Sequence, residues 1–218
     1  MINYSQLSDY IVMRCNLNNQ SISNKKLQKI IYYCQAYHIA IYKEELINND
    51  FEAWVHGAVL PALWREYSCY GYNDINKYNE LEYNSLRDIF GEYLCSFLDK
   101  LIDKLSIFSA DYLEERNHKE SPWKEARDGY EAYESCNEII SKDSMNKYYS
   151  QLLCKEANAD MKVKKVSIKS KKLLMAKKRL AERNLTVINE DNKQEYYEVI
   201  FNEYEQGREY TWRAMNGK

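Results

Sequence analysis

The chain has 218 residues, of which 45% are hydrophobic and 29% charged, an ordinary balance for a globular protein. Only 2 Pro and 6 Gly argue against a turn-rich β architecture and favour helices with short connections. The net charge of −2 hides a division, because residues 1–161 hold 17 Lys and Arg against 25 Asp and Glu, whereas residues 162–218 hold 14 against 8.

The first predicted element is an amphipathic helix over residues 4–15, with Leu7, Ile11 and Val12 on one face. Ser5 or Ser8 could serve as its N-cap. A polar, Asn-rich loop over residues 16–22 follows.

A long helix is predicted to begin after Ser23, whose hydroxyl can accept from a free first-turn amide. Lys26 stands where a capping box needs Glu or Gln, so that box is absent. We expect His38 to be a hydrogen-bonded core histidine. The apolar stripe, widened by tyrosines, suits a central helix contacted on two sides and consists of Leu27, Ile30, Ile31, Cys34, His38 and Ile41.

A short extended arm follows, since Phe51, Ala53 and Val55 alternate with other residues up to Gly57. Pro61 is then suited to the first turn of a second helix, which closes at Gly71.

Residues 72–83 lack a helical period and are predicted to be an exposed loop. Asn84 or Ser85 then caps a helix that extends to Leu105 and is expected to make the main core contact with the central helix. Gly91 inside it costs about 1 kcal/mol relative to Ala, so we expect it to permit a close helix crossing.

Ser109 is predicted to cap a short helix from Ala110 to about Asn117. Ser121 as N-cap and Pro122 at the first helical position predict another helix start. A closing helix is expected over residues 141–157.

The shift in charge marks the predicted domain boundary, with a helical domain over residues 1–155 and a charged, mostly helical extension over residues 156–218. The extension has a basic stretch over residues 162–183 and an acidic stretch over residues 190–209. These two stretches could pair as a helical hairpin, dock on the acidic main domain, or contact a partner.

Four groups of motifs follow one another along the chain: Lys26-Leu27-Gln28-Lys29 leading into Tyr32-Tyr33, Ala53-Trp54 with Gly57 and then Pro61, the run from His118 to Ala126, and Ile140-Ser141 with Met145 and Tyr148-Tyr149. In this order they resemble the SocA-like, or Panacea, domain of antitoxins from bacterial and phage toxin–antitoxin pairs. The resemblance covers about residues 4–152, with two departures: the family usually has Gly-Pro where this chain has Gly57-Ala58, and often Thr where it has Asn117.

His56 and His118 are the obvious candidates for chemistry. Nothing in their spacing supplies a nucleophile with an orienting group, and there is no H-E-x-x-H motif or Cys pair for a metal. We therefore expect no catalytic residue, no metal and no cofactor. The residues singled out instead, as anchors of the loops or as partner contacts, are Trp54, His56, Gly57, Pro61, His118, Pro122 and Trp123.

The basic stretch could contact nucleic acid or a toxin, because clustered positive charge attracts phosphates regardless of sequence. Its plainer interpretations are a solvated helix face or a complement to the protein's own acidic surface. It lacks the Trp, Phe and Leu face of a membrane-surface helix. The candidate contacts are Lys171, Lys172, Lys177, Lys178, Arg179 and Arg183.

The six cysteines are dispersed, and we find neither a signal peptide nor an apolar run long enough to span a membrane, so we expect a cytoplasmic protein with reduced thiols. The fold class expected is mainly α with a short extended arm. The resemblance implies an antitoxin that binds a protein toxin from an adjacent gene, stoichiometrically and without catalysis. Alternatives are a prophage or mobile-element adaptor or anti-defence protein that binds a host protein, and a DNA-binding regulator acting through the basic stretch.

Overall fold

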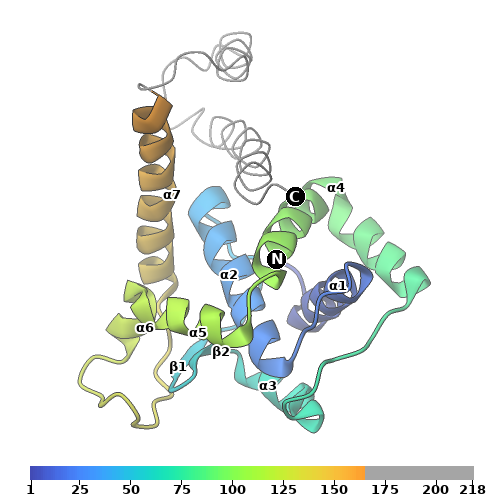
Figure 1. Ribbon diagram of the computed structural model, residues 1–218, viewed down its shortest axis with the longest axis horizontal. Coiled ribbons are helices and arrows are strands. Elements are labelled where there is room, and N and C mark those ends of the chain that lie inside the picture. Colours follow the sequence, from blue (N-terminus) through green and yellow to red (C-terminus); the bar gives the residue numbers. More distant parts are fainter. Residues whose placement is uncertain (165–218) are drawn as a thin grey trace, which may run out of the picture. The chain divides into compact units, whose positions relative to one another are not determined.

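The computed structural model describes residues 1–164, with side chains described as far as Lys155. The described part is mainly α-helical with one small two-stranded sheet, as predicted (Figure 1). The chain divides into two compact units, Met1–Ser150 and Gln151–Lys218. The predicted helices of the extension and its six basic candidate residues lie outside the described residues, and the predicted boundary at residue 155 stays a prediction.

The described residues form a series of helices, with one short β-hairpin between the second helix and the third. In chain order they are α1 (Tyr4–Leu17), α2 (Asn24–Tyr42), β1 (Glu52–Trp54), β2 (Gly57–Val59), α3 (Pro61–Glu66), the 3-10 turn η1 (Ser68–Tyr70), α4 (Glu80–Ser106), α5 (Ala110–Lys119), α6 (Ser121–Ala126) and α7 (Lys142–Lys164).

Helix α2 is the centre of the first unit, since it contacts α1, α3, α4, α5 and β2 (Figure 1). Leu27, Ile30 and Ile31 on its apolar stripe are completely buried, and so are the rings of Tyr32 and Tyr33. Each such aliphatic side chain contributes about 1.5–3 kcal/mol by leaving water. The prediction of a central helix contacted on two sides is therefore confirmed.

Polar side chains on α2 are also buried, where they bind the backbone of the surrounding loops. The Lys26 ammonium donates to the carbonyl oxygens of Ser21 (2.8 Å) and Ser106 (2.6 Å). The Gln35 amide oxygen accepts from the N–H of Leu46 and of Ile47, both at 2.9 Å. These contacts satisfy loop amides and carbonyls that would otherwise be buried without partners.

Three predicted helix starts are confirmed. Ser23 Oγ accepts from the N–H of Lys26 (3.4 Å), and Ser109 Oγ accepts from that of Tyr112 (3.1 Å). Pro61 opens α3, where its missing N–H costs nothing.

The predicted cap of the first helix is wrong. Asn3 is the N-cap of α1, and its side chain accepts from the N–H of Ser5 at 2.8 Å. Ser5 already has helical geometry, while the Ser8 hydroxyl donates to the Ser5 carbonyl oxygen at 2.8 Å. The helix therefore begins at Tyr4, as predicted, and only its N-cap residue differs from the prediction.

Helix α4 begins before the predicted Asn84 or Ser85. Asn79 is its N-cap and accepts from the N–H of Leu81 (3.1 Å) and of Glu82 (3.2 Å). The loop expected over residues 72–83 is therefore shorter, because its last four residues are helical.

The role expected for Gly91 is wrong. Gly91 has φ 75° and ψ 162°, which bends α4, and no atom lies within 4 Å of the place a Cβ would take. It supplies a left-handed backbone conformation, not a close helix crossing. The partner of α4 also differs from the expectation, since α4 packs more extensively on α1 than on α2. Arg14 of α1 pairs with Asp103 of α4 at 2.6 Å.

Two boundaries near the C-terminal end of the first unit are corrected. Helix α6 starts at Ser121 itself, with Glu120 as the N-cap residue and no side-chain cap. Helix α7 starts at Lys142 and extends to Lys164, beyond the predicted end at residue 157.

The extended arm is one strand of an antiparallel hairpin. Residue pairs Glu52–Val59, Ala53–Ala58 and Trp54–Gly57 lie opposite one another in β1 and β2. The chain before α7 joins the free edge of β1, with the Ala53 N–H donating to the Glu138 carbonyl oxygen at 2.9 Å.

Candidate functional site

The turn between β1 and β2 is held against α2 and α5 by buried polar side chains. The Lys29 ammonium donates to the Ala58 carbonyl oxygen (2.9 Å), and the Ala58 N–H donates to Asn117 Oδ1 (2.6 Å). Gly57 has φ 88°, and a Cβ there would lie 2.8 Å from Lys29 Nζ and 2.9 Å from Asn117 Oδ1. Only glycine fits this position without displacing both side chains.

Lys29 is completely buried, and its burial lowers the pKa of the ammonium to about 7, while the negative charge of Glu114 opposes that shift. A charged group in this position is costly unless it is hydrogen-bonded. The Ala58 carbonyl oxygen accepts the hydrogen bond that the Lys29 ammonium donates.

The start of α3 is fixed in the same manner. The N–H of Leu60 donates to Gln28 Oε1 at 2.9 Å, and Pro61 follows at the first helical position. Pro61 therefore lies at an anchored turn.

The two tryptophans predicted as candidates are joined through the backbone. Trp123 Nε1 donates to the Trp54 carbonyl oxygen at 3.1 Å, and Trp54 Nε1 donates to Glu52 Oε2 at 2.7 Å. The Trp54 ring packs against Trp64 with centroids 5.5 Å apart. Pro122, which directly precedes Trp123 in the sequence, is buried in the first turn of α6. These contacts link α6 to the hairpin.

The two candidate histidines lie on different elements. His56 is in the hairpin turn, with 76% of its side chain exposed and its Nδ1 3.1 Å from Glu114 Oε1. His118 lies in the last turn of α5, and its ring is 4.3 Å from that of Trp123. Burial lowers the pKa of His118, because it disfavours the charged form of the ring. Within residues 1–155, its Nε2 is buried without a hydrogen-bond partner.

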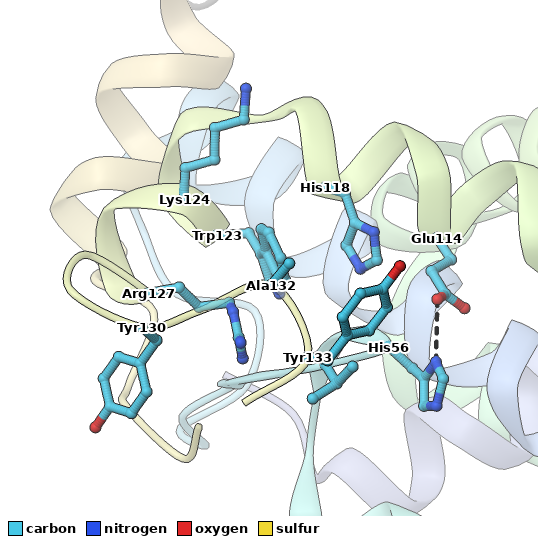
Figure 2. Close-up of a pocket in the computed structure, with 10 residues that line it drawn as sticks. His56, Glu114, His118, Trp123, Lys124, Arg127, Tyr130, Ala132 and Tyr133 are labelled. Carbon is cyan, nitrogen blue, oxygen red and sulfur yellow. Dashed lines mark hydrogen bonds and ion pairs between the residues drawn. The ribbon is translucent and has the colours of Figure 1, made fainter. Parts of the chain in front are cut away.

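These groups meet at a pocket of about 450 Å³ on the surface of the first unit (Figure 2). The pocket brings together His56, His118 and Trp123, whereas Trp54, Gly57, Pro61 and Pro122 do not line it. The lining residues are Val55, His56, Glu114, His118, Trp123, Lys124, Arg127, Tyr130, Ala132 and Tyr133.

Arg127 is a lining residue that sequence reasoning missed. Its guanidinium donates to the carbonyl oxygens of Ala53 (2.9 Å), Glu131 (2.9 Å) and Glu134 (2.7 Å). Its Cζ also lies 5.1 Å from the centroid of the Trp123 ring. Arg127 thus holds the loop between α6 and α7 against the hairpin. No local motif marks this role, because the carbonyls it binds belong to irregular or distant segments.

Tyr133 on the same loop was also missed. Its side chain is 91% exposed, and its ring forms one side of the pocket (Figure 2). A large aromatic ring held in water beside a pocket is typical of surfaces that bind other proteins.

The chemistry available in the pocket is limited. The pair of His56 and Glu114 resembles a base with its orienting carboxylate, but no Ser, Thr or Cys is among the residues that line the pocket. Among the described residues, no cluster of three or more His, Cys, Asp or Glu could hold a metal ion. No helix in the described part of the chain is long and apolar enough to cross a membrane.

The fold and pocket define a mainly helical domain with an aromatic and cationic surface site. Residues 27–124 match the family model described as the antitoxin SocA-like, Panacea domain. This match confirms the resemblance over these residues. No curated protein and no solved structure matches the chain. The match ends at Lys124, so Arg127, Tyr130, Ala132 and Tyr133 of the pocket come from outside it.

Proposed function

We propose that this protein is the antitoxin of a toxin–antitoxin pair and that it neutralises a protein toxin by binding it directly. The observation that carries the proposal is the match of residues 27–124 to the SocA-like, Panacea domain. The partner is expected to be the product of an adjacent gene.

Neutralisation is stoichiometric, not catalytic. The pocket offers aromatic and cationic side chains for contact, and its lining contains no Ser, Thr or Cys nucleophile. We place this binding in the cytoplasm, where cysteines stay reduced. The site residues named above are proposed to act in part as anchors (Gly57, Pro61, Pro122) and in part as contacts (His56, His118, Trp123).

Co-expression tests this proposal. The full chain is produced together with the product of the adjacent reading frame, under separate promoters, in cells that the second product alone stops from growing. Growth resumes when both are made, and the two proteins co-purify. If growth is not rescued and nothing co-purifies, the protein is not the antitoxin of that product. A host protein as the partner is then the competing proposal.

A second candidate function is DNA binding through the basic stretch, favoured by the excess of 14 Lys and Arg over 8 Asp and Glu in residues 162–218. It requires an affinity for duplex DNA that falls steeply with salt. The test replaces Lys171, Lys172, Lys177, Lys178, Arg179 and Arg183 by alanine in the full chain. Unchanged DNA affinity at 50 mM salt would remove this candidate.

A further inference from the structure

The pocket carries positive charge that the described residues do not neutralise. Arg127 is only 6% exposed, and its three hydrogen-bond partners are carbonyl oxygens. Within residues 1–155 no carboxylate pairs with its guanidinium, and the Lys124 ammonium has neither an ion pair nor a hydrogen bond. A charged side chain buried as far as that of Arg127 is normally paired, whereas the Lys124 side chain is exposed to solvent.

The one acidic residue of the lining is already committed to other cations. Glu114 pairs with the Lys25 ammonium through Oε2 and with His56 Nδ1 through Oε1 at 3.1 Å. Lys25 also pairs with Asp111 at 2.7 Å. Glu114 therefore cannot serve as the counter-ion of Arg127 or Lys124.

The neighbouring acidic loop does not supply a counter-ion either. Arg127 binds the main-chain carbonyls of Glu131 and Glu134, and the Glu134 carboxylate accepts instead from the N–H of Glu131 at 3.0 Å. A guanidinium has five N–H donors, so the three bonds of Arg127 leave two of them without a partner in the described part of the chain.

The walls of the pocket suit a short side chain. The Trp123 and Tyr133 rings form apolar faces, and the volume of about 450 Å³ is ample for one acidic side chain with its main chain. Figure 2 shows the Lys124 ammonium directed away from the other lining side chains. Since no partner among residues 1–155 holds it there, Lys124 is free to turn toward an occupant at the rim.

We propose that the pocket receives an aspartate or glutamate side chain of the neutralised protein, with its carboxylate near Arg127 and Lys124 and its stem against Trp123 and Tyr133. This inference rests on the proposed antitoxin function. Of the four contact residues, Trp123 and Lys124 lie in the segment that matches the family, and Arg127 and Tyr133 lie in the loop that follows it. The loop, which lies outside the family match, then contributes to the choice of partner.

The test measures the affinity of the purified full chain for the purified product of the adjacent gene. Lys124→Glu reverses the rim charge, and Lys147→Glu makes the same change at an exposed lysine of α7 that does not line the pocket. Tyr133→Ala is compared with Tyr72→Ala, whose ring is 100% exposed and lies outside the pocket. Thermal unfolding confirms that all four variants fold.

Lys124→Glu is expected to weaken binding about tenfold or more, because close interfacial charge pairs couple at that level. Tyr133→Ala is also expected to weaken binding, whereas both controls stay within about twofold of the wild type, as distant surface changes do. Reversing each Asp and Glu of the partner to Lys in turn should give one partner variant that restores binding to Lys124→Glu.

Two results would overturn the inference. In the first, the Lys124→Glu variant binds the partner as tightly as the Lys147→Glu variant does. In the second, the Lys124→Glu variant binds the partner weakly, and no Asp-to-Lys or Glu-to-Lys change in the partner restores its affinity for that variant. Both leave the proposed function standing, since the wild-type chain still binds. A wild-type chain that does not bind the partner at all refutes the proposed function, and the inference fails with it.

Discussion

Asn117 and Ala58 are the two positions at which this chain departs from the pattern of the family it resembles, and they contact each other. Asn117 Oδ1 accepts from the Ala58 N–H at 2.6 Å, and Asn117 is completely buried. A proline at position 58 would have no N–H to donate, so replacing Ala58 by proline should compensate for losing the Asn117 acceptor. In this sense the two residues form one compensated pair.

Asn117→Ala is expected to lower the free energy of unfolding by about 1–3 kcal/mol, because it leaves the Ala58 N–H buried without an acceptor. Urea unfolding followed by circular dichroism measures the change, with Asn84→Ala at an exposed position as the control. A loss below about 0.5 kcal/mol would show that water or another group replaces Asn117.

Adding Ala58→Pro removes that unsatisfied N–H, so the double variant Ala58→Pro with Asn117→Ala should lose less stability than the two single changes together. A double-mutant cycle measures this coupling. Strict additivity would contradict the compensated pair.

The lowered pKa of the buried Lys29 predicts that the stability of the fold depends on pH. Its pKa is about 7 in the folded protein and that of an ordinary lysine in the unfolded chain. Between pH 7 and pH 10 the unfolded chain therefore binds more protons at this position. Stability must then rise with pH.

The wild type is expected to gain up to a few kcal/mol relative to Lys29→Met as the pH rises from 7 to 9.5, a comparison that cancels the titration of groups common to both proteins. Urea unfolding at several pH values measures the difference. A constant difference would mean that Lys29 keeps an ordinary pKa in the fold.

At the scale of the elements, the glycines Gly57 and Gly91 have positive φ for different reasons. A Cβ at Gly57 would meet Lys29 Nζ and Asn117 Oδ1, whereas a Cβ at Gly91 would meet nothing within 4 Å. Gly57 therefore fixes both the hairpin turn and its approach to α2 and α5. Gly91 only bends α4.

Gly91→Ala is expected to cost about 1–3 kcal/mol of stability, because φ 75° with ψ 162° is a backbone conformation that essentially only glycine adopts. Gly57→Ala adds the displacement of two buried polar groups and should cost clearly more. Thermal unfolding of both variants orders the two costs. Equal losses would show that the contacts of Gly57 carry no energy.

Helix existence could be predicted from sequence, because it depends on local signals such as the apolar stripe of α2 and the hydroxyls of Ser23 and Ser109. The N-cap residues Asn3 and Asn79 could not, because Ser5 and Ser8 near the start of α1, and Asn84 and Ser85 near the start of α4, are equally suitable capping residues. The sequence does not predict the second strand, because the alternation of apolar residues ends at Gly57, where that strand begins. Its pairing depends on Lys29 and Asn117, which lie far away in the sequence.

Only part of the candidate site could be predicted from the sequence, because some of its residues carry no local signal. His56, His118 and Trp123 were conspicuous in the sequence and line one pocket, but Arg127 and Tyr133 complete it. Arg127 acts through carbonyls of the hairpin and of the following loop, and Tyr133 is one of 21 tyrosines. Nothing local distinguishes either residue.

For the whole molecule, the central claim is that it acts by occupying its partner. A family domain supplies the helical base, and the loop beyond the family match supplies the other side of the pocket. The proposed function needs one molecule of this protein for each molecule of toxin, because an inhibitor that acts by binding turns nothing over.

Titration tests this claim most directly. A fixed amount of the purified toxin is mixed with increasing amounts of the full chain, and its residual activity is measured after equilibration. The account predicts a linear fall that reaches zero near equal molar amounts. Loss of activity at a small fraction of that amount would reveal a catalyst, and undiminished activity at excess would show that this toxin is not the partner; either result contradicts the account.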